Sequence, residues 1–233
     1  MRVSVLVPVH NERQTLKTIV ERVVTVAKPH EVIIVDDGST DGSRQVAEAL
    51  RKTYSTTVRV IAHTRNRGKG AAIISGLAQS TGDVVMIQDA DLEYHPEDYP
   101  VALRLIEQGY ADAVYGSRFL GPHRAFLFWH YAGNRLLTFV GNLLTSGILT
   151  DMETGFKMVR TDVMKALALS SSTFDIEVEI TVKLFRFGYR VYEIPITYTG
   201  RIYSEGKKIT WKDGVRALLA LFKWAVMVRS RTR

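Results

Sequence analysis

Carboxylates stand close together where a short apolar run of the chain ends. Asp89 and Asp91 follow the run Val84–Gln88, with Ala90 between them, and Glu93 comes two residues later. Carboxylate oxygens at this spacing suit Mg²⁺ or Mn²⁺, which proteins often bind jointly with substrate phosphates. Such an ion neutralises charge that develops on a diphosphate leaving group. Taken alone, the motif also fits a solvated acidic turn that caps the next helix.

Two further polar segments suit the parts of a nucleotide. Asp37 follows an apolar run and is able to accept hydrogen bonds from a nucleobase or ribose, while Ser39 or Asp41 suits a helix N-cap. Lys69 belongs to the segment 66–70, which precedes a helix and presents a cation or backbone N–H groups to phosphate. The segment lacks the third glycine of a dinucleotide-binding fingerprint and is not a P-loop.

The elements that must position these residues alternate along the first half. Runs rich in Val and Ile, bounded by turn residues, predict strands buried on both faces: Val3–Val9, Glu31–Val35, Val58–Ala62, Val84–Gln88 and Ala113–Gly116. Amphipathic stretches between them predict helices: Thr15–Ala27, Ser43–Lys52, Ala71–Gln79 and Glu97–Gly109. This alternation predicts an α/β fold with a mostly parallel sheet covered by helices on both faces.

The polar clusters follow the strands directly. Residues 10–12, 36–39 and 89–91 each stand just after an expected strand. Ligands of open parallel sheets bind beyond the carboxyl ends of the strands. The three clusters are therefore expected to converge on one edge and to form an active site there.

The second half has a different pattern. Residues Ala125–Ile148 predict one or two largely apolar helices. The later segments predict a strand at Thr154–Val159, a helix at Glu177–Phe187, a strand at Arg190–Tyr198, a basic loop at Arg201–Ile209 and a final helix at Trp211–Val228. No linker or internal repeat is evident. We expect one domain over 1–233 with an elaborated C-terminal part.

Composition excludes several classes of protein. The 233 residues are 46% hydrophobic and 24% charged, which is ordinary for a globular protein, and they include no cysteine, which excludes disulfides and thiol chemistry. No apolar stretch reaches the ~18 residues of a membrane span. The net charge of +7 suits nucleic acid, anionic lipid or phosphate ligands alike. We expect a cytoplasmic chain.

The motifs together resemble family 2 glycosyltransferases. The match rests on Pro8-Val9-His10-Asn11-Glu12, on residues 35–41, on Asn66-Arg67-Gly68-Lys69-Gly70 and on residues 89–93, in that order and spacing. Residues 116–118, 155–157 and the loop Arg201 to Lys207 extend it, and the ensemble is similar to the dolichol-phosphate mannose synthase branch and its polyprenyl-phosphate relatives. The resemblance implies a GT-A fold and an inverting, metal-dependent transfer from a nucleoside-diphosphate sugar.

The resemblance also implies a nucleotide-sugar-binding half in 1–117, which contains most of the donor site, and an acceptor-binding and interfacial-helix half in 118–233. Residues expected to bind the nucleotide sugar are Pro8, His10, Glu12, Val35, Asp37, Lys69, Asp89 and Ala90. The implied ligands of Mg²⁺ or Mn²⁺ are Asp89, Asp91 and Glu93, and Asp91 is counted among the catalytic residues. Two of these residues depart from the branch: Glu93 replaces a common Gln, and His10 replaces a common Tyr.

Arginines are the candidates for the acceptor side. Arg118, Arg135 and Arg201, with Lys207, are expected to hold an acceptor phosphate or the leaving diphosphate, because a guanidinium pairs two oxygens at once. A lipid phosphate is already anionic and needs no strong base. A hydroxyl acceptor needs one, and Asp151 is then the candidate, with a cap or turn as its alternative. Glu177 and Glu179 fit helix-start residues or residues that face the site.

The apolar segment 125–148 suits either a core helix or a helix in a membrane interface. It lacks acidic residues and is rich in aromatic ones, and Arg124 precedes it while Arg135 lies within it. The final helix and the basic residues 229–233 also suit anionic headgroups. We expect peripheral contact with the cytoplasmic face of a membrane, through this segment and the C-terminal helix, with a separate membrane subunit as a further possibility.

Four functions compete on this basis. The first is transfer of a hexose to a polyprenyl or dolichyl phosphate, with GDP-mannose ahead of UDP-glucose as donor. The second is the same chemistry on a hydroxyl acceptor with Asp151 as base. The third is a nucleotide-sugar-binding protein without turnover. Nucleic-acid binding ranks last, because the chain lacks a recognised motif and interleaved aromatic residues.

Overall fold

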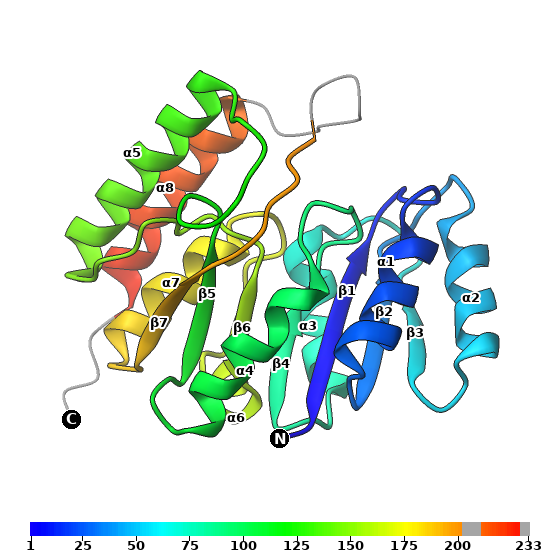
Figure 1. Ribbon diagram of the computed structural model, residues 1–233. Coiled ribbons are helices and arrows are strands. Elements are labelled where there is room, and N and C mark those ends of the chain that lie inside the picture. The colour runs from blue at the N-terminus through cyan, green and yellow to red at the C-terminus, as the bar shows by residue number, and fades with distance from the viewer. Residues whose placement is uncertain (202–210, 229–233) are drawn as a thin grey trace.

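A single seven-stranded sheet forms the centre of the molecule (Figure 1). The computed structural model describes residues 1–201 and 211–228 of the chain. The strands, in sheet order, are β3 (Val58–Ala62), β2 (Glu31–Asp36), β1 (Val3–Val9), β4 (Val84–Ile87), β6 (Lys157–Arg160), β5 (Ala113–Ser117) and β7 (Val191–Pro195). All neighbouring strands run parallel except β6, which is antiparallel to both β4 and β5. The predicted α/β fold with a mostly parallel sheet is confirmed.

Burial on both faces explains why the central strands are so apolar. Every residue of β2 and of β4 is buried. Side chains of successive strand residues point to opposite faces, so a strand covered on both sides reads as a continuous apolar run. The register pairs Pro8 of β1 with Val35 of β2 and Leu6 with Ile87 of β4, so these three strands end close together.

Helices cover the two faces and divide the core into two clusters. On one face lie α1 (Leu16–Arg22, continued by a π-helical turn Val23–Ala27), α2 (Ser43–Thr53) and α4 (Tyr99–Glu107, preceded by a 3₁₀ turn Pro96–Asp98). On the other lie α3 (Lys69–Gln79), α6 (Thr161–Ala166) and α7 (Ile176–Arg186). Two further helices, α5 (Phe128–Thr145) and α8 (Trp211–Met227), pack against each other and against α7 (Figure 1). Within the described residues, none of the helices is long and apolar enough to cross a membrane.

The second half departs from the sequence prediction in detail. The segment 125–148 forms the one helix α5, and the strand expected at Thr154–Val159 begins only at Lys157. Residues 151–156 instead form a loop, because their backbone and side chains are bound by Arg118, Tyr94 and Lys157. The short helix α6 was not predicted, since six residues carry too little periodicity to detect.

Candidate active site

The predicted convergence of polar clusters occurs at the carboxyl ends of β1, β2 and β4. His10 follows β1, and its Nδ1 lies 3.0 Å from the carbonyl oxygen of Asp37, which follows β2. Asp89 and Ala90 follow β4, and Ala90 is buried, as is Val35 inside β2. The structure therefore brings the expected donor-site residues to one edge.

Asp37 holds the loop that leads into α3. Its carboxylate lies 2.6 Å from Nδ1 of His63 and accepts hydrogen bonds from the backbone N–H groups of Arg67 (2.9 Å) and Gly68 (2.7 Å). Asp37 is 3% exposed. These contacts favour a role in shaping the wall of the site, while direct contact with a nucleobase or ribose stays a prediction. His63 belongs to none of the sequence motifs, and its contact with Asp37 is seen only in the folded structure.

Glycines let that loop approach a second backbone segment closely. A Cβ at Gly70 would overlap the carbonyl oxygen of Ser171, and one at Gly68 would overlap that of Ser172. Glu179 in turn accepts hydrogen bonds from the backbone N–H groups of Ser170 (3.0 Å) and Ser171 (2.7 Å). The first turn of α7 thus fixes the segment against which the glycine loop packs.

A buried chain of alternating charges links α7 to the acidic motif. Nζ of Lys69 lies 2.7 Å from Asp89 and 3.0 Å from Glu177, and Nζ of Lys157 lies 2.6 Å from the other oxygen of Glu177. Lys157 is fully buried and also donates to the carbonyl oxygens of Met152 and Thr154.

The charges in this chain hold one another ionised. Burial favours a higher pKa for Glu177, but Lys157 and Lys69 outweigh it and hold that pKa below its ordinary value. Burial lowers the pKa of Lys69, and Asp89 and Glu177 raise it above its ordinary value. Of the two glutamates at the start of α7, Glu177 therefore faces the site. Lys157 belongs to the segment 155–157 that extends the family resemblance, but the sequence assigned it no role.

Arg201 binds the remaining carboxylates of the acidic motif. Its guanidinium lies 2.7 Å from Asp91, 3.3 Å from Glu93 and 3.6 Å from Glu12. Tyr198 donates a further hydrogen bond to Glu93 at 2.8 Å. Burial and the like charges of Asp89 and Glu93 raise the pKa of Asp91 to about 8, against the opposing effect of Arg201.

This crowding of negative charge fits a divalent cation in chemistry. All-oxygen donors suit Mg²⁺ or Mn²⁺, and such an ion would relieve the repulsion that raises the pKa of Asp91. In the part of the chain that is described, however, no three acidic or histidine side chains form a ready-made metal site. Lys69 binds Asp89, whereas Arg201 binds Asp91 and Glu93, so each carboxylate of the motif already has a cationic side chain beside it. The three-carboxylate metal site stays a prediction.

Two arginines flank one aromatic ring on the acceptor side. Arg118 forms a bidentate pair with Asp151, with both N–O distances at 2.7 Å, and its backbone N–H donates to the same carboxylate at 3.0 Å. The guanidinium groups of Arg118 and Arg135 lie 5.7 and 5.9 Å from the centre of the Phe119 ring. Arg118 also lies 5.5 Å from the ring of Tyr198, whose hydroxyl binds the acidic motif. The arginines predicted to bind the acceptor therefore lie next to the acidic motif predicted to bind the donor.

The surroundings of Asp151 do not favour the predicted role of general base. Its side chain is 0% exposed, and both oxygens are occupied by Arg118. This arrangement favours a role in orienting Arg118. Lys207, the last of the predicted phosphate-binding residues, lies outside the described residues.

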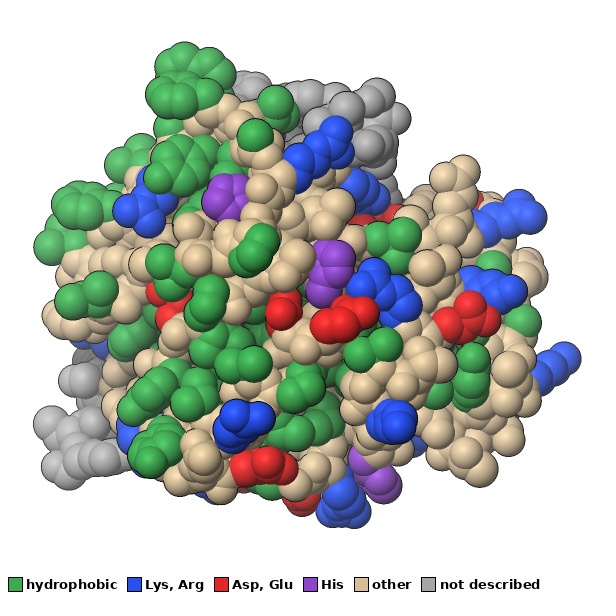
Figure 2. Space-filling model, in the orientation of Figure 1, with side chains coloured by type: hydrophobic (Ala, Val, Ile, Leu, Met, Phe, Trp, Pro, Cys, Tyr) green, Lys and Arg blue, Asp and Glu red, His purple; other side chains and the backbone are tan. Residues whose placement is uncertain are grey.

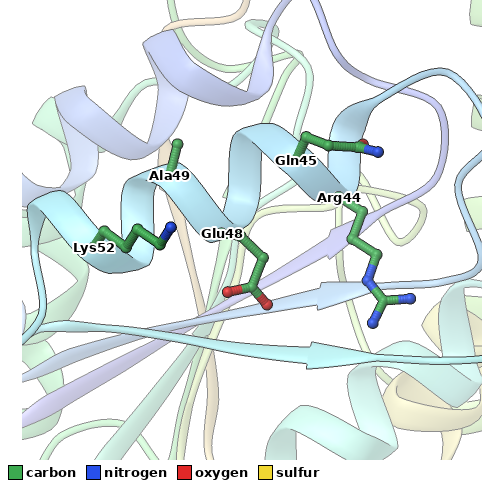
Figure 3. A pocket seen from close by; sticks show the side chains of 5 residues that line it. All are labelled: Arg44, Gln45, Glu48, Ala49 and Lys52. Atoms are coloured by element: carbon green, nitrogen blue, oxygen red, sulfur yellow. The ribbon is translucent and has the colours of Figure 1, made fainter.

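A hollow on the surface of the described residues lies away from this edge. The hollow in Figure 3 has a volume of about 390 Å³, and the side chains that line it all belong to α2: Arg44, Gln45, Glu48, Ala49 and Lys52. A hollow lined by one helix alone has no convergent polar groups from several elements, which is what a binding site needs. The candidate site is therefore defined by its charged side chains.

The family follows from a comparison with known proteins. Residues 4–168 match the model of the family described as glycosyl transferase family 2. The chain belongs to this family. The family predicted from the motifs is thereby confirmed, and the seven-stranded sheet with its helices agrees with the GT-A fold expected from them.

Curated relatives of this family 2 chain carry names of polyprenyl-phosphate enzymes. It is 31% identical to a dolichol-phosphate mannosyltransferase of Pyrococcus furiosus over 96% of its own length and 64% of the relative's. It is 29% identical to an undecaprenyl-phosphate mannosyltransferase of Micrococcus luteus, over 98% and 96% of the two chains. The chain thus spans less than two thirds of the Pyrococcus relative and nearly all of the Micrococcus one.

Solved structures support the fold. Glucosyl-3-phosphoglycerate synthase from Mycobacterium tuberculosis, in complex with Mn²⁺, UDP-glucose and phosphoglyceric acid, superposes with a TM-score of 0.76. The superposition covers 98% of this chain and 81% of that chain at 18% identity. At this identity the likeness shows the GT-A fold alone.

Proposed function

We propose that the chain transfers a hexose from a nucleoside-diphosphate sugar to a polyprenyl phosphate, with inversion at the anomeric carbon. GDP-mannose is the favoured donor and UDP-glucose the next. The observation that carries the proposal is the adjacency of an acidic strand-end edge to Arg118 and Arg135, beside a helix with an exposed apolar face. The names of the relatives, which act on dolichol phosphate and undecaprenyl phosphate, support it.

On the donor side, different charged residues bind the metal ion and the diphosphate. Asp89 and Asp91, with Glu93, are the residues that would hold a divalent cation, which supplies charge neutralisation for a departing diphosphate. Lys69 lies 2.7 Å from Asp89 and so stands where it is able to reach diphosphate oxygens. Arg201 shares its guanidinium among the acidic side chains and exchanges these partners for phosphate oxygens when substrate binds.

The acceptor side needs positioning more than proton abstraction. A phosphate acceptor carries negative charge at neutral pH, and Arg118 and Arg135 present fixed donors to it. Asp151 keeps the guanidinium of Arg118 in one orientation through two hydrogen bonds. Catalysis then comes from the alignment of two charged substrates and stabilisation of the developing charge.

The apolar faces of α5 and α8 suit contact with a bilayer. Side chains on them are largely exposed, and Figure 2 shows hydrophobic groups gathered over α5: Phe128, Trp129, Leu136, Phe139 and Leu143 on α5, and Leu219, Phe222 and Val226 on α8. Exposed apolar area of this kind marks an interaction surface. We place the enzyme on the cytoplasmic face of a membrane, where a polyprenyl phosphate presents its headgroup.

A transfer assay tests the activity. Labelled GDP-mannose or UDP-glucose is incubated in separate tubes with a polyprenyl phosphate and Mn²⁺ or Mg²⁺, and label is followed into the organic phase. Metal-dependent label that is lost in Asp91→Ala supports the proposal and names the donor. Slow release of nucleotide in water with no label in the organic phase refutes the lipid acceptor and favours a hydroxyl acceptor.

Vesicle binding tests the membrane contact separately. Phe139 is 66% exposed on α5, and Val101 is 53% exposed on α4, on the other side of the molecule. Phe139→Ser is expected to weaken co-sedimentation with vesicles of anionic lipid several-fold, whereas Val101→Ser leaves it unchanged. Equal effects of the two substitutions would contradict an interface at α5.

A further inference from the structure

Glu153 lies in the loop that joins the acceptor side to the donor side. This loop, residues 151–156, begins at Asp151, the partner of Arg118, and ends against the acidic motif. A Cβ at Gly155 would overlap Oδ2 of Asp89, and the backbone N–H of Gly155 donates to the hydroxyl of Tyr94 at 2.8 Å. The loop thus runs from the acceptor arginine to the donor carboxylates.

The carboxyl group of Glu153 has a buried oxygen without a hydrogen-bond partner among the described residues. This oxygen is Oε1, which is shielded from water. Asp151, two residues earlier, has both oxygens bound by Arg118. A buried acceptor without a donor is unfavourable, and in native proteins such a group calls for a functional explanation.

Charged groups of both signs surround Glu153. Burial has the largest effect and raises the pKa of Glu153 to about 7; Lys157 and Arg118 lower it, while Glu177 and Asp151 raise it. A carboxyl group of this kind exchanges its proton near neutral pH, which is the condition for efficient general acid–base work. A phosphate monoester loses its second proton at about pH 6, in the same range.

We propose that Glu153 accepts the proton of the singly protonated acceptor phosphate as the glycosidic bond forms. The proposal rests on the proposed function, because it assigns a role toward that acceptor. A phosphate oxygen bonds to the anomeric carbon while the bond from that carbon to the β-phosphate oxygen breaks, and the nucleoside diphosphate leaves with the electron pair. The P–OH proton passes to the carboxylate of Glu153 and from there to water.

The pH dependence of transfer tests this role. Glu153→Gln keeps the shape of the side chain, and kcat/KM for polyprenyl phosphate is measured from about pH 5.5 to 8.5. We expect the largest loss, about 10²-fold, between about pH 6 and 7, where part of the acceptor still carries its proton and part of Glu153 is ionised. Near pH 8.5, where the acceptor has lost that proton, we expect a loss below about 3-fold. Glu153→Asp is expected to recover part of the activity near pH 6, since it restores a carboxylate.

Matched controls separate a chemical role from a structural one. Glu31 is a buried carboxylate far from the acidic edge, at the start of β2, and Glu31→Gln is expected to leave the pH profile of transfer unchanged. The melting temperature of Glu153→Gln is expected to be no lower than that of the wild type, because its Oε1 has no partner to lose.

The outcomes are distinguishable. A Glu153→Gln profile parallel to that of the wild type, or an equal loss at about pH 6.5 and at about pH 8.5, overturns the role of Glu153 and leaves the proposed function standing. A wild-type enzyme that transfers no label to polyprenyl phosphate at any pH overturns the proposed function and this role with it.

Discussion

Lys157→Met removes one member of the buried charge chain while keeping most of the side-chain volume. The ammonium group of Lys157 is fully buried and lies 2.6 Å from Glu177. It also donates to the carbonyl oxygens of Met152 and Thr154. After the substitution, Glu177 keeps Lys69 as its only ion-pair partner among the described residues, and the two carbonyl groups lose their ammonium donor.

The expected cost follows from the burial of the pair. Removing one partner of a buried ion pair costs roughly 3–5 kcal/mol, because the other charge is left without full compensation. Domains of this size are stable by about 5–15 kcal/mol, so the variant is expected to fold with a small margin. A loss of this size lowers the melting temperature by roughly 10 °C.

Urea unfolding at two pH values checks both the size and the origin of the loss. In the wild type, Lys157 and Lys69 hold the pKa of Glu177 below its ordinary value of 4.5, against burial. The paired carboxylate therefore stabilises the fold above pH 4.5, and this contribution is lost as the pH falls through the lowered pKa. In Lys157→Met the pKa of Glu177 rises, so protonation relieves the unpaired charge and the deficit shrinks in acid.

The matched double variant provides the decisive comparison. Lys157→Met together with Glu177→Gln removes both charges, and it is expected to be more stable than Lys157→Met alone by at least 1 kcal/mol. A deficit for Lys157→Met below about 1 kcal/mol at neutral pH, or a double variant no more stable than the single one, would refute the electrostatic account.

Three other substitutions test separate parts of the structure. Burial favours a higher pKa for Glu31, but hydrogen bonds from serine, threonine and arginine side chains and a threonine backbone N–H lower it to about 2. Glu31→Gln is therefore expected to lower the free energy of unfolding in urea by about 2 kcal/mol at pH 7. This deficit is expected to shrink as the pH falls from 4.5 to 2. Gly155→Ala would place a Cβ on Asp89, and we expect the kcat of transfer to fall at least about tenfold; an unchanged kcat would show that Asp89 does not need its present position. Asp151→Asn leaves the guanidinium of Arg118 without its bidentate partner. Steady-state kinetics are expected to show a raised KM for the acceptor and an unchanged KM for the donor. The reverse pattern would assign Arg118 to the donor side.

The donor edge was predictable from sequence because its signals are local. Strands buried on both faces read as apolar runs, and parallel strands end at one edge, so Asp37 and Asp89 were expected to meet. Family motifs then supplied roles for the polar residues between them. The helices of the first half were equally visible from their amphipathic spacing.

Partners distant in sequence could not be predicted in the same way. Lys69 meets Glu177 across more than one hundred residues, and Lys157 at the start of β6 meets Glu177 on α7 twenty residues later. No periodicity encodes such pairing. The occupation of Asp151 by Arg118 is of the same kind, since sequence shows a carboxylate and an arginine but not that they bind each other.

The position of β6 also determines the order in which the molecule is able to fold. β5 ends at residue 117, yet its two neighbours in the sheet are β6 and β7, which begin at residues 157 and 191. A chain emerging from the ribosome therefore completes β1 to β4 long before β5 finds a hydrogen-bonding partner. Pairing at such sequence separation is slow, because a long loop must close before its contacts form. The sheet is thus expected to stay incomplete beside β4 until β6 and β7 have been synthesised, so the first four strands await partners that the chain supplies only after residue 157.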